Sequence, residues 1–221
     1  MSDHKLDFSI RKFTSEDINT VSQLKQNSIR SLNSRDYTYK QTEALIDRYS
    51  REFNSGEVAF INHIATFFDA LSNPSSDLDQ AKALVAHMGD QIIGYAAISN
   101  LDWLNNSQTL YELFVHPEYI HKGVGTKLLQ TLETNVEGNC KVINLFASLT
   151  GEPFYQANGY RIVEHSSFFI KGIKIPIVQM EKWLVTPSET EQFFWDISQQ
   201  GKRNIEWLVT ETEAFFRETF N

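Results

Sequence analysis

The sequence predicts an α/β (α+β) fold in which helices flank a mixed, mostly antiparallel sheet, with a helical appendage at the C-terminus. Two apolar runs, 83–88 and 91–99, are joined by the turn dipeptide Gly89-Asp90, which is typical of a β-hairpin. A second hairpin is expected over 161–184, where Lys171-Gly172 supplies the turn. Between the hairpins, helical and strand patterns follow one another without the regular alternation of a parallel βαβ array.

The N-terminal part is expected to form one strand over 8–13, followed by helices. Two residue pairs have the spacing of a capping box, in which two side chains satisfy free amides at a helix start: Thr14 with Asp17, and Thr38 with Gln41. Apolar residues at helical spacing follow both pairs and predict two helices. A third amphipathic helix is expected over 58–71.

The middle of the chain is expected to mix short strands and helices. The predicted elements are a strand over 110–115, a helix over 125–136, a strand over 142–147 and a short helix over 153–158. Gly138 and Gly159 follow the two helices, and glycine readily adopts the backbone conformation that ends a helix. Pro176 lies within the last strand and predicts that this strand is an edge strand or carries a bulge.

Composition limits which partners and which cellular compartment are expected for this chain. The chain has 221 residues and a formal net charge of −8, which argues against a nucleic-acid partner because non-specific binding needs basic patches. Cys140 is the one cysteine, so an internal disulfide is excluded and a reducing compartment is favoured. We expect its thiol to be buried in the core. No apolar stretch suits a membrane span, and the charged N-terminus lacks the apolar core of a signal peptide, so a cytoplasmic location is expected.

A domain boundary is expected near Thr186, which gives a main domain over 1–186 and a helical extension over 187–221. Ser188 with Glu191 has the spacing of another capping box. Two amphipathic faces follow, built from Phe193, Phe194, Ile197, Ile205, Leu208, Val209, Phe215 and Phe216. Such helices need a surface to cover. Docking on the chain's own sheet is favoured, and a homodimer contact is the alternative.

The segment 111–129 (YELFVHPEYIHKGVGTKLL) is where we expect the chemistry, because a strand leads through a glycine-containing turn into a helix. Free amides at a helix N-terminus carry partial positive charge and suit a pyrophosphate. The turn has two glycines and three nearby basic residues: Gly123, Gly125, His121, Lys122 and Lys127. The order Gly125-Thr126-Lys127 excludes a Walker A loop, and Leu128 stands where a dinucleotide fingerprint needs its third glycine. The alternative is a plain glycine turn before a core helix.

This segment resembles the acetyl-CoA-binding signature of the GNAT superfamily of N-acetyltransferases. That signature has a Val-x-Pro-x-Tyr turn and then Arg/Gln-x-x-Gly-x-Gly/Ala, and it is matched by Val115, Pro117, Tyr119, Gly123 and Gly125. Ile120 departs from it at the Arg/Gln position. A second motif of the family is matched downstream by Phe154, Tyr155, Gly159 and Tyr160. Thr150-Gly151 stands there in place of the usual Asn-Ala.

The resemblance implies a GNAT-type sheet and transfer of an acetyl group from acetyl-CoA, as co-substrate, to a primary amine by direct attack. The residues expected to bind the cofactor are Phe114, Val115, His121, Lys122, Gly123, Val124, Gly125, Thr126, Thr150 and Phe154. No metal is expected, because the six histidines show no metal-type spacing. The alternative is a non-catalytic acyl-CoA-binding or interaction module on the same fold.

Two residues are expected to move protons. The amine is an ammonium near neutral pH and must lose a proton, whereas the thiolate leaving group must gain one. Tyr155 matches the family's usual general acid. The alternative interpretation is that Tyr155 is a packing residue of the core. Glu112 is the candidate base that takes the proton of the amine. The alternative interpretation is that Glu112 is a solvated carboxylate on a strand. Strand alternation predicts that Glu112 and Phe114 share one face of the sheet.

The acceptor is expected to be a small-molecule or peptide amine, with neither a nucleic acid nor a membrane as partner. In the family, the acceptor site usually involves the first two helices and the last hairpin. Arg30, Arg35 and Tyr37 lie in the first connection, and each is interpreted as a surface residue in preference to a specificity contact.

Overall fold

The computed structural model describes residues 6–51, 82–99, 101–102, 105–136 and 140–197. The chain divides into two compact units, Met1–Leu184 and Val185–Asn221. The helix predicted over 58–71 and the last helix of the C-terminal extension lie outside the described residues.

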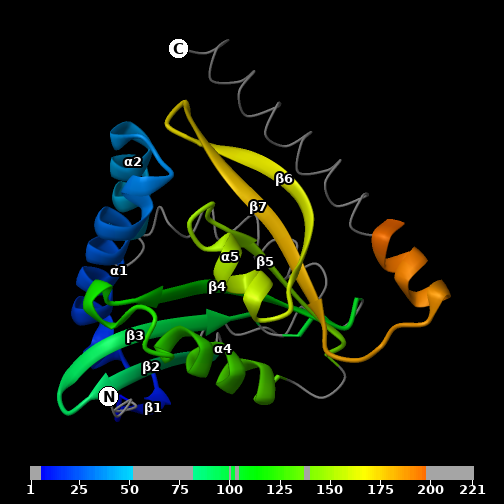
Figure 1. Cartoon of the computed structure of the whole chain (residues 1–221), viewed down its shortest axis with the longest axis horizontal. Coiled ribbons are helices and arrows are strands. Elements are labelled where there is room, and N and C mark those ends of the chain that lie inside the picture. The colour runs from blue at the N-terminus through cyan, green and yellow to red at the C-terminus, as the bar shows by residue number, and fades with distance from the viewer. Residues whose placement is uncertain (1–5, 52–81, 100, 103–104, 137–139, 198–221) are drawn as a thin grey trace, which may run out of the picture. The chain divides into compact units, whose positions relative to one another are not determined.

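The larger unit is built on a seven-stranded sheet with the order β1-β2-β3-β4-β5-β7-β6 (Figure 1). Its strands are β1 (Ser9–Lys12), β2 (Lys82–Met88), β3 (Gln91–Ile98), β4 (Ser107–Val115), β5 (Val142–Ala147), β6 (Arg161–Ile170) and β7 (Ile173–Trp183). Of these neighbouring pairs, β4 with β5 runs parallel and the others run antiparallel. The mixed, mostly antiparallel α/β fold is therefore confirmed.

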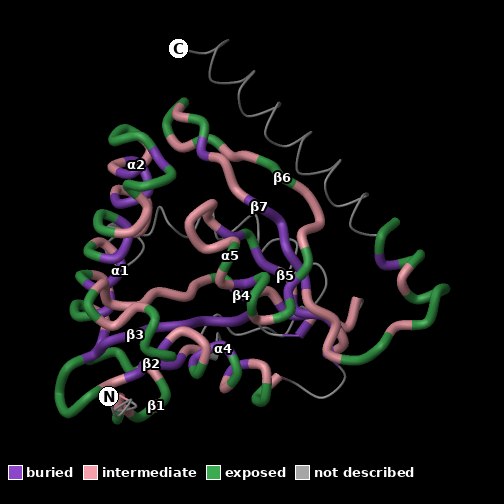
Figure 2. Tube along the Cα trace, viewed as in Figure 1, coloured by how far each residue is buried: buried purple, intermediate pink, exposed green. Residues whose placement is uncertain are grey.

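Helices cover both faces of this sheet. They are α1 (Ile18–Leu32), α2 (Tyr39–Arg51), α4 (Val124–Thr134) and α5 (Glu152–Ala157), with short 3-10 turns η1 (Ser15–Asp17), η2 (Asn33–Arg35) and η4 (Pro117–Tyr119). Strand side chains alternate, so Val85 and Tyr95 pack with α1, whereas Ala86 and Ala96 pack with α4. Strand β3 is buried along almost its whole length (Figure 2). Cys140 lies in the α4 cluster, which confirms the predicted core thiol.

Both predicted capping boxes of the N-terminal part are present. The Thr14 N–H donates to Asp17 Oδ2 at 2.9 Å, and Arg11 donates two further bonds to this carboxylate at 2.7 and 2.8 Å. The bonds from Arg11, and then those from Thr14, lower the pKa of Asp17 to about 2. The Thr38 N–H donates to Gln41 Oε1 at 2.9 Å, directly before α2. Local sequence thus determines where both helices begin.

A β-bulge in β4 changes the direction of the side chains around it. Ala97 of β3 pairs with Glu112, but the next residue of β3 pairs with Leu110, so Tyr111 is the extra residue. Leu110 and Leu113, three residues apart, therefore pack into the same core cluster, while Tyr111 is exposed.

Strands β4 and β5 part before β4 ends. Their parallel ladder stops at the pair Leu110–Leu145, whereas β4 continues to Val115. The His116 N–H donates to Ile93 O on β3. Main-chain groups alternate in direction along a strand, so those of Val115 point away from β3, toward the side that β5 has left. The strands thus diverge directly before the segment predicted to bind phosphate.

Pro176 does not lie in an edge strand. Strand β7 is interior, with β5 and β6 as its neighbours, so this prediction is wrong. The ladder between β5 and β7 begins only at Val178, however, and Pro176 precedes it. One side of β7 therefore has no strand beside Pro176, and a residue without N–H is tolerated there. The bulge of this hairpin lies in β6, between Ile162 and Glu164.

Tyr37 connects the loop after β5 to β7 where these strands part. Its side chain is buried, so its interpretation as a surface residue is wrong. Its hydroxyl donates to Pro176 O at 2.8 Å and accepts from the Leu149 N–H at 2.9 Å. One phenol thereby satisfies two main-chain groups that lie outside the strand ladder.

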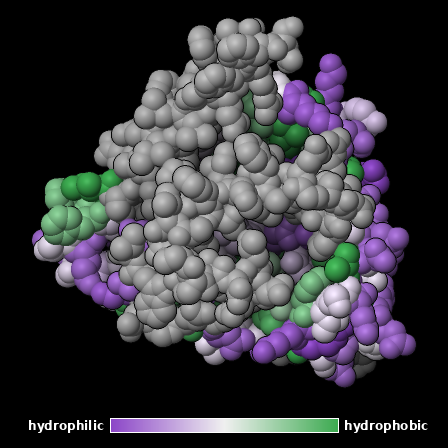
Figure 3. Space-filling view, turned by 180° about the vertical axis from the view of Figure 1, so that it is seen from behind, coloured by the Kyte–Doolittle hydropathy of each residue, from purple (hydrophilic) through white to green (hydrophobic). Residues whose placement is uncertain are grey.

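The described part of the smaller unit holds a helix over 189–197. The Ser188 N–H and hydroxyl each donate to Glu191 Oε2 at 2.9 Å, which is the predicted capping box. The exposed apolar residues of this helix are Phe193, Phe194 and Ile197. Figure 3 shows apolar side chains at the surface of the described part of the chain. The domain boundary at Thr186, and the surface that these residues cover, stay predictions.

Replacing Tyr37 by phenylalanine keeps the ring and removes the hydroxyl, which leaves a partly buried carbonyl and amide without partners. The free energy of unfolding, measured by chemical denaturation, is expected to fall by about 2 kcal/mol, because each orphaned group costs about 1 kcal/mol. The matched control is Tyr39→Phe, since Tyr39 is 79% exposed, and it should be nearly neutral. Equal stability of the two variants would contradict the bridging role.

Candidate active site

The N-terminus of α4 presents free main-chain amides beside the end of β4. The first bond of this helix runs from the Lys127 N–H to Gly123 O, so the amides of residues 124–126 have no acceptor within the helix. Gly123 caps the helix with φ 84°, and His121 also has left-handed backbone, with φ 59°. Glycine adopts this conformation without strain. The turn therefore has the geometry that suits an anion, and the binding of a phosphate there stays a prediction.

Gly125 and Phe154 bring the two predicted family motifs, 115–125 and 154–160, into contact. A Cβ atom at Gly125 would lie 3.3 Å from Phe154 Cε2 and Cζ, and 3.4 Å from Val115 Cγ2. The ring from α5 thus packs against the first turn of α4, and any side chain at position 125 would crowd it. Glycine is therefore needed here for packing as well as for the expected approach of a ligand.

The other predicted cofactor residues of the turn differ in exposure. His121, Lys122 and Gly123 are exposed, and Lys122 Nζ lies 5.2 Å from the centroid of the Tyr119 ring. Thr126 is partly exposed. Val124 is buried in the core cluster, so only its main chain is available to a ligand.

Thr150 is already engaged by another part of the chain. Its hydroxyl donates to Asp36 Oδ2 at 2.7 Å, which joins the loop after β5 to the connection between α1 and α2. The expected contact with a cofactor would have to compete with this bond.

Tyr155 carries a buried hydroxyl without a hydrogen-bond partner among the described residues. The side chain, in α5, is 9% exposed, and its ring packs edge-on against Phe154 at 5.1 Å and Tyr160 at 5.7 Å. Burial, and then the nearby phenol of Tyr49, raise the pKa of Tyr155 above the usual value for tyrosine, so the group is protonated at neutral pH. A buried O–H without a partner is costly, and an atom of a bound ligand would satisfy it.

Glu112 lies in a buried ion pair. Its Oε2 is 2.6 Å from Lys25 Nζ of α1, and the two side chains are 11% and 2% exposed, so the alternative of a solvated carboxylate is wrong. Lys25 Nζ also lies 6.0 Å from the Phe114 ring, in line with Glu112 and Phe114 sharing a face. Oε1 of Glu112 makes no ion pair or hydrogen bond within the described parts of the chain. One carboxylate oxygen therefore remains for a ligand.

Tyr49 of α2 lies next to both candidate groups. Its ring is 5.3 Å from that of Phe114, and Lys25 Nζ is 5.8 Å from its centroid. Its phenol also contributes to the raised pKa of Tyr155. Side chains from α1, α2 and β4 thus form one cluster of Lys25, Tyr49, Glu112 and Phe114.

Sequence reasoning missed Lys25 and Tyr49, although the signal for Lys25 was present. The buried residues of α1 recur at helical spacing and are Val21, Leu24, Lys25, Ser28 and Ile29. A lysine inside an apolar stripe must find a partner, because an isolated buried charge is costly. The helix pattern alone does not identify that partner, which the structure shows to be Glu112.

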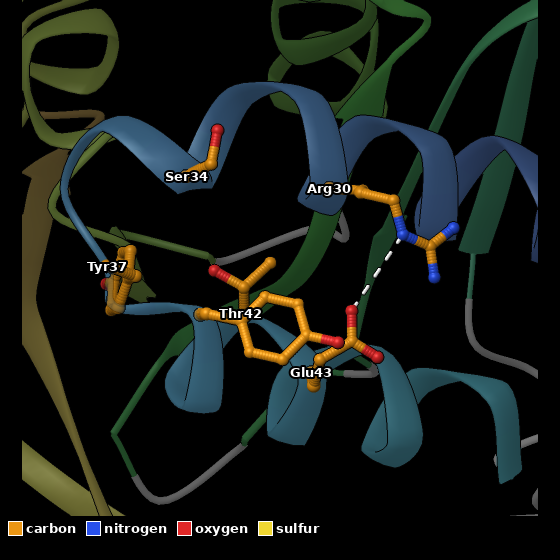
Figure 4. Close-up of a pocket in the computed structure, with 6 residues that line it drawn as sticks. Arg30, Ser34, Tyr37, Thr42 and Glu43 are labelled. Carbon is orange, nitrogen blue, oxygen red and sulfur yellow. Dashed lines mark ion pairs between the residues drawn. The ribbon is translucent and has the colours of Figure 1, made fainter.

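A hollow of about 470 Å³ lies between the end of α1 and the start of α2 (Figure 4). It is lined by Arg30, Ser34, Tyr37, Tyr39, Thr42 and Glu43. Arg30 and Glu43 are both exposed and approach each other to 3.9 Å. Arg35 is exposed in η2, so both arginines are surface residues as predicted. Tyr37 is the residue that connects this hollow with the loop after β5.

Two further observations concern metals and membranes. Among the described residues, no group of three or more histidine, cysteine, aspartate or glutamate side chains could hold a metal ion. No helix in the described ranges is both long and apolar enough to cross a membrane.

Comparison with protein families gives one match. A family model described as an acetyltransferase (GNAT) domain matches residues 35–184. This range contains both family motifs, together with Tyr49, Glu112 and Tyr155. Among curated proteins, no sequence matches the chain.

Comparison with solved structures gives many matches of the same fold. A GCN5-related N-acetyltransferase from Rhodopseudomonas palustris has a TM-score of 0.64 and 22% identity, over 83% of this chain and 100% of its own. The PaiA N-acetyltransferase of Thermoplasma acidophilum, in complex with coenzyme A, has a TM-score of 0.57 and 22% identity, over 80% and 99%. The ribosomal-protein-S18-alanine N-acetyltransferase of Escherichia coli has a TM-score of 0.52 and 12% identity, over 83% and 97%.

Replacing Glu112 by glutamine removes the carboxylate that lies 2.6 Å from the buried Lys25 ammonium. The free energy of unfolding is expected to fall by about 3 kcal/mol, the usual effect of breaking a buried pair. The double variant Lys25→Met/Glu112→Gln removes both charges and should regain most of that loss, because a well-packed neutral pair can replace a buried ion pair. Denaturation of both variants tests this, and a Glu112→Gln variant as stable as the wild type would show that the pair is not buried in solution.

Proposed function

The chain belongs to the family of GNAT acetyltransferases and is an acyltransferase; we propose that it moves the acetyl group of acetyl-CoA to a primary amine by direct attack. The observation that carries the proposal is a pair of buried groups, each with an unsatisfied polar atom: the Tyr155 hydroxyl and Glu112 Oε1. One is a donor and the other an acceptor, which are the two functions that acetyl transfer to an amine requires.

The turn before α4 is the proposed site of the cofactor's pyrophosphate. Support comes from the free amides of residues 124–126 and from the positive charge of Lys122 and Lys127, a local exception in an acidic chain. The main chain of Val115 and the ring of Phe154 would hold the arm that leads to the thioester. The Thermoplasma acidophilum protein of the same fold contains coenzyme A, in agreement with this proposal.

The proposed reaction balances with these two groups alone. The acceptor nitrogen, in its uncharged form, attacks the thioester carbonyl, so that a C–N bond forms as the C–S bond breaks. The surplus proton on nitrogen passes to Glu112 Oε1, directly or through water, and the departing sulfur takes the proton of Tyr155. The products are an amide and a free thiol, and exchange with solvent returns both side chains to their starting states.

The acceptor is proposed to be a small-molecule or peptide amine. The Escherichia coli protein of the same fold is named for alanine of a ribosomal protein, which agrees with an amine on a peptide. A cytoplasmic location and a homodimer stay predictions.

A screen of amines with acetyl-CoA, following the release of free thiol, tests the proposed activity directly. Amine-dependent thiol release supports catalysis. Binding of acetyl-CoA without thiol release from any amine would favour the alternative, a non-catalytic acyl-CoA-binding module, to which the bond between Thr150 and Asp36 gives some support.

Replacing Gly123 by alanine is expected to weaken acetyl-CoA binding about tenfold, because the left-handed backbone that orients the helix amides becomes strained by about 1 kcal/mol. A Cβ there meets no atom within 4 Å, so the effect comes from the backbone. Gly89→Ala is the matched control, since Gly89 also has positive φ and open space. Both variants should lose similar stability, but only Gly123→Ala should lose affinity in calorimetric titration. Equal affinities would place the pyrophosphate elsewhere.

Replacing Tyr155 by phenylalanine keeps the packed ring and removes the donor. Turnover is expected to fall about 10²-fold, as is usual for lost acid catalysis, with little change in cofactor affinity. Tyr160→Phe is the matched control, because the Tyr160 hydroxyl donates to Glu133 Oε1 at 3.1 Å and has a structural partner. It should lower stability and leave kcat near the wild-type value. Full turnover in Tyr155→Phe would make Tyr155 a packing residue.

A further inference from the structure

Gln179 is a buried polar side chain that the fold itself does not use. It lies on β7 and is 7% exposed. Its main chain belongs to the ladder with Phe146 of β5, but its side-chain amide makes no hydrogen bond within the described part of the chain. The amide has two N–H donors and an oxygen acceptor, and leaving such a group unpaired in the interior lowers stability. A bound ligand with a donor and an acceptor of its own would satisfy it.

Phe146, directly opposite Gln179, is an apolar ring that the fold leaves uncovered. Two residues that pair across an antiparallel ladder place their side chains next to each other on one face of the sheet. Strand β5 lies between β4 and β7, yet Phe146 is 52% exposed. Large apolar side chains on interior strands are usually buried. An unpaired amide and an uncovered ring therefore lie side by side.

The ring and the amide lie on the face of the sheet that carries Glu112. Leu145 and Ala147, which flank Phe146 along β5, pack into the core cluster of α4, so Phe146 points to the opposite face. Glu112 pairs with Ala97, which packs with α1 on that opposite face. Phe146 also directly follows the last residue of β5 that pairs with β4. The ring and the amide therefore lie where these two strands part, next to the candidate site.

The Gln179 amide has the groups that recognise the main chain of a peptide. In an extended chain the N–H and C=O of one residue point to the same side, and a side-chain amide can accept from one and donate to the other. Strands β4 and β7 have β5 between them, so Glu112 and Gln179 stand at least about 10 Å apart across the sheet. An extended peptide spans this distance with about two or three residues. A peptide with its amino terminus beside Glu112 therefore presents the following residues to Gln179.

We propose that Gln179 and Phe146 select peptide amino termini with apolar side chains as acceptors of the acetyl group. The Gln179 amide hydrogen-bonds to the peptide main chain, and the Phe146 ring packs against an apolar side chain. The inference rests on the proposed transfer of an acetyl group to an amine beside Glu112. Simple alkyl amines and polyamines lack both features and are expected to be poor acceptors.

Three acceptors test the proposal with the full-length protein and acetyl-CoA: trileucine amide, triglycine amide and butylamine. The wild type is expected to show about tenfold higher kcat/KM for trileucine amide than for triglycine amide, because a leucine side chain buries apolar surface against Phe146. At equal concentrations of the uncharged amine, triglycine amide should in turn exceed butylamine, since only the peptide can bond with Gln179.

Replacing Gln179 by methionine keeps the approximate shape of the side chain and removes the amide. The kcat/KM for both peptides should fall about tenfold more than that for butylamine. The melting temperature should stay equal or rise, because an unpaired buried amide is lost. A structural role would instead lower stability and affect the three acceptors alike, and that result would overturn the proposal.

Replacing Phe146 by alanine should abolish the preference for trileucine amide over triglycine amide. Phe169→Ala is the matched control, since Phe169 on β6 is 57% exposed, and this variant should keep the preference. An unchanged preference in a folded Phe146→Ala variant would contradict the role of the ring and overturn the proposal.

The wild-type comparison keeps the proposal testable even if a variant does not fold. Equal use of the two peptides, or transfer to butylamine but to neither peptide, would overturn the selection of apolar peptide termini while leaving acetyl transfer intact. Absence of transfer to these acceptors and to every amine of a broad panel would instead contradict the proposed function, and the inference with it.

Discussion

Strands β4 and β5 share a parallel ladder only as far as Leu110 and Leu145, and the candidate site lies where they part. Beyond that pair, the main chain of β4 has no strand on one side, and β7 has no strand on its β5 side at Pro176. Backbone groups away from a ladder must be satisfied by other means. The Tyr37 hydroxyl satisfies two of them, and a ligand is proposed to meet those at Val115. The divergence of two strands thus leaves main-chain groups without ladder partners, and a ligand is proposed to bind some of these groups.

The elements around this point contribute different chemistry. Helix α4 begins at Gly123 and supplies main-chain amides, while α5 supplies a phenol in Tyr155. Strand β4 supplies the Glu112 carboxylate, which pairs with Lys25 of α1. Each group is held by packing on a rigid element rather than by a loop. The unsatisfied hydroxyl and carboxylate oxygen therefore lower the stability of the folded chain when no ligand is bound.

Much of the fold could be predicted from sequence because its signals are local. Capping pairs such as Thr14 with Asp17, and the turn at Gly89-Asp90, depend on residues a few positions apart. The strand, turn and helix of the proposed anion site were predictable for the same reason, since they are contiguous. Pro176 was misinterpreted because its environment depends on where another strand, β5, ends.

The contacts that could not be predicted join segments far apart in the chain. Lys25 and Glu112 lie in α1 and β4, and Tyr37 reaches Leu149 across the molecule. Hydrophobic periodicity describes one element at a time, so it gives the face on which Lys25 lies but not its partner. The face of Glu112 was predictable by alternation, whereas the cation beside it depended on the packing of α1 against the sheet.

A crystal structure of the protein with a non-hydrolysable acetyl-CoA analogue would test most directly where the cofactor binds. The account predicts pyrophosphate oxygens within hydrogen-bond distance of the amides of residues 124–126. It also predicts the atom that replaces the thioester sulfur within reach of the Tyr155 hydroxyl, on the same side as Glu112 Oε1. An analogue bound away from the start of α4, or a Tyr155 hydroxyl still without a partner in the complex, would contradict it.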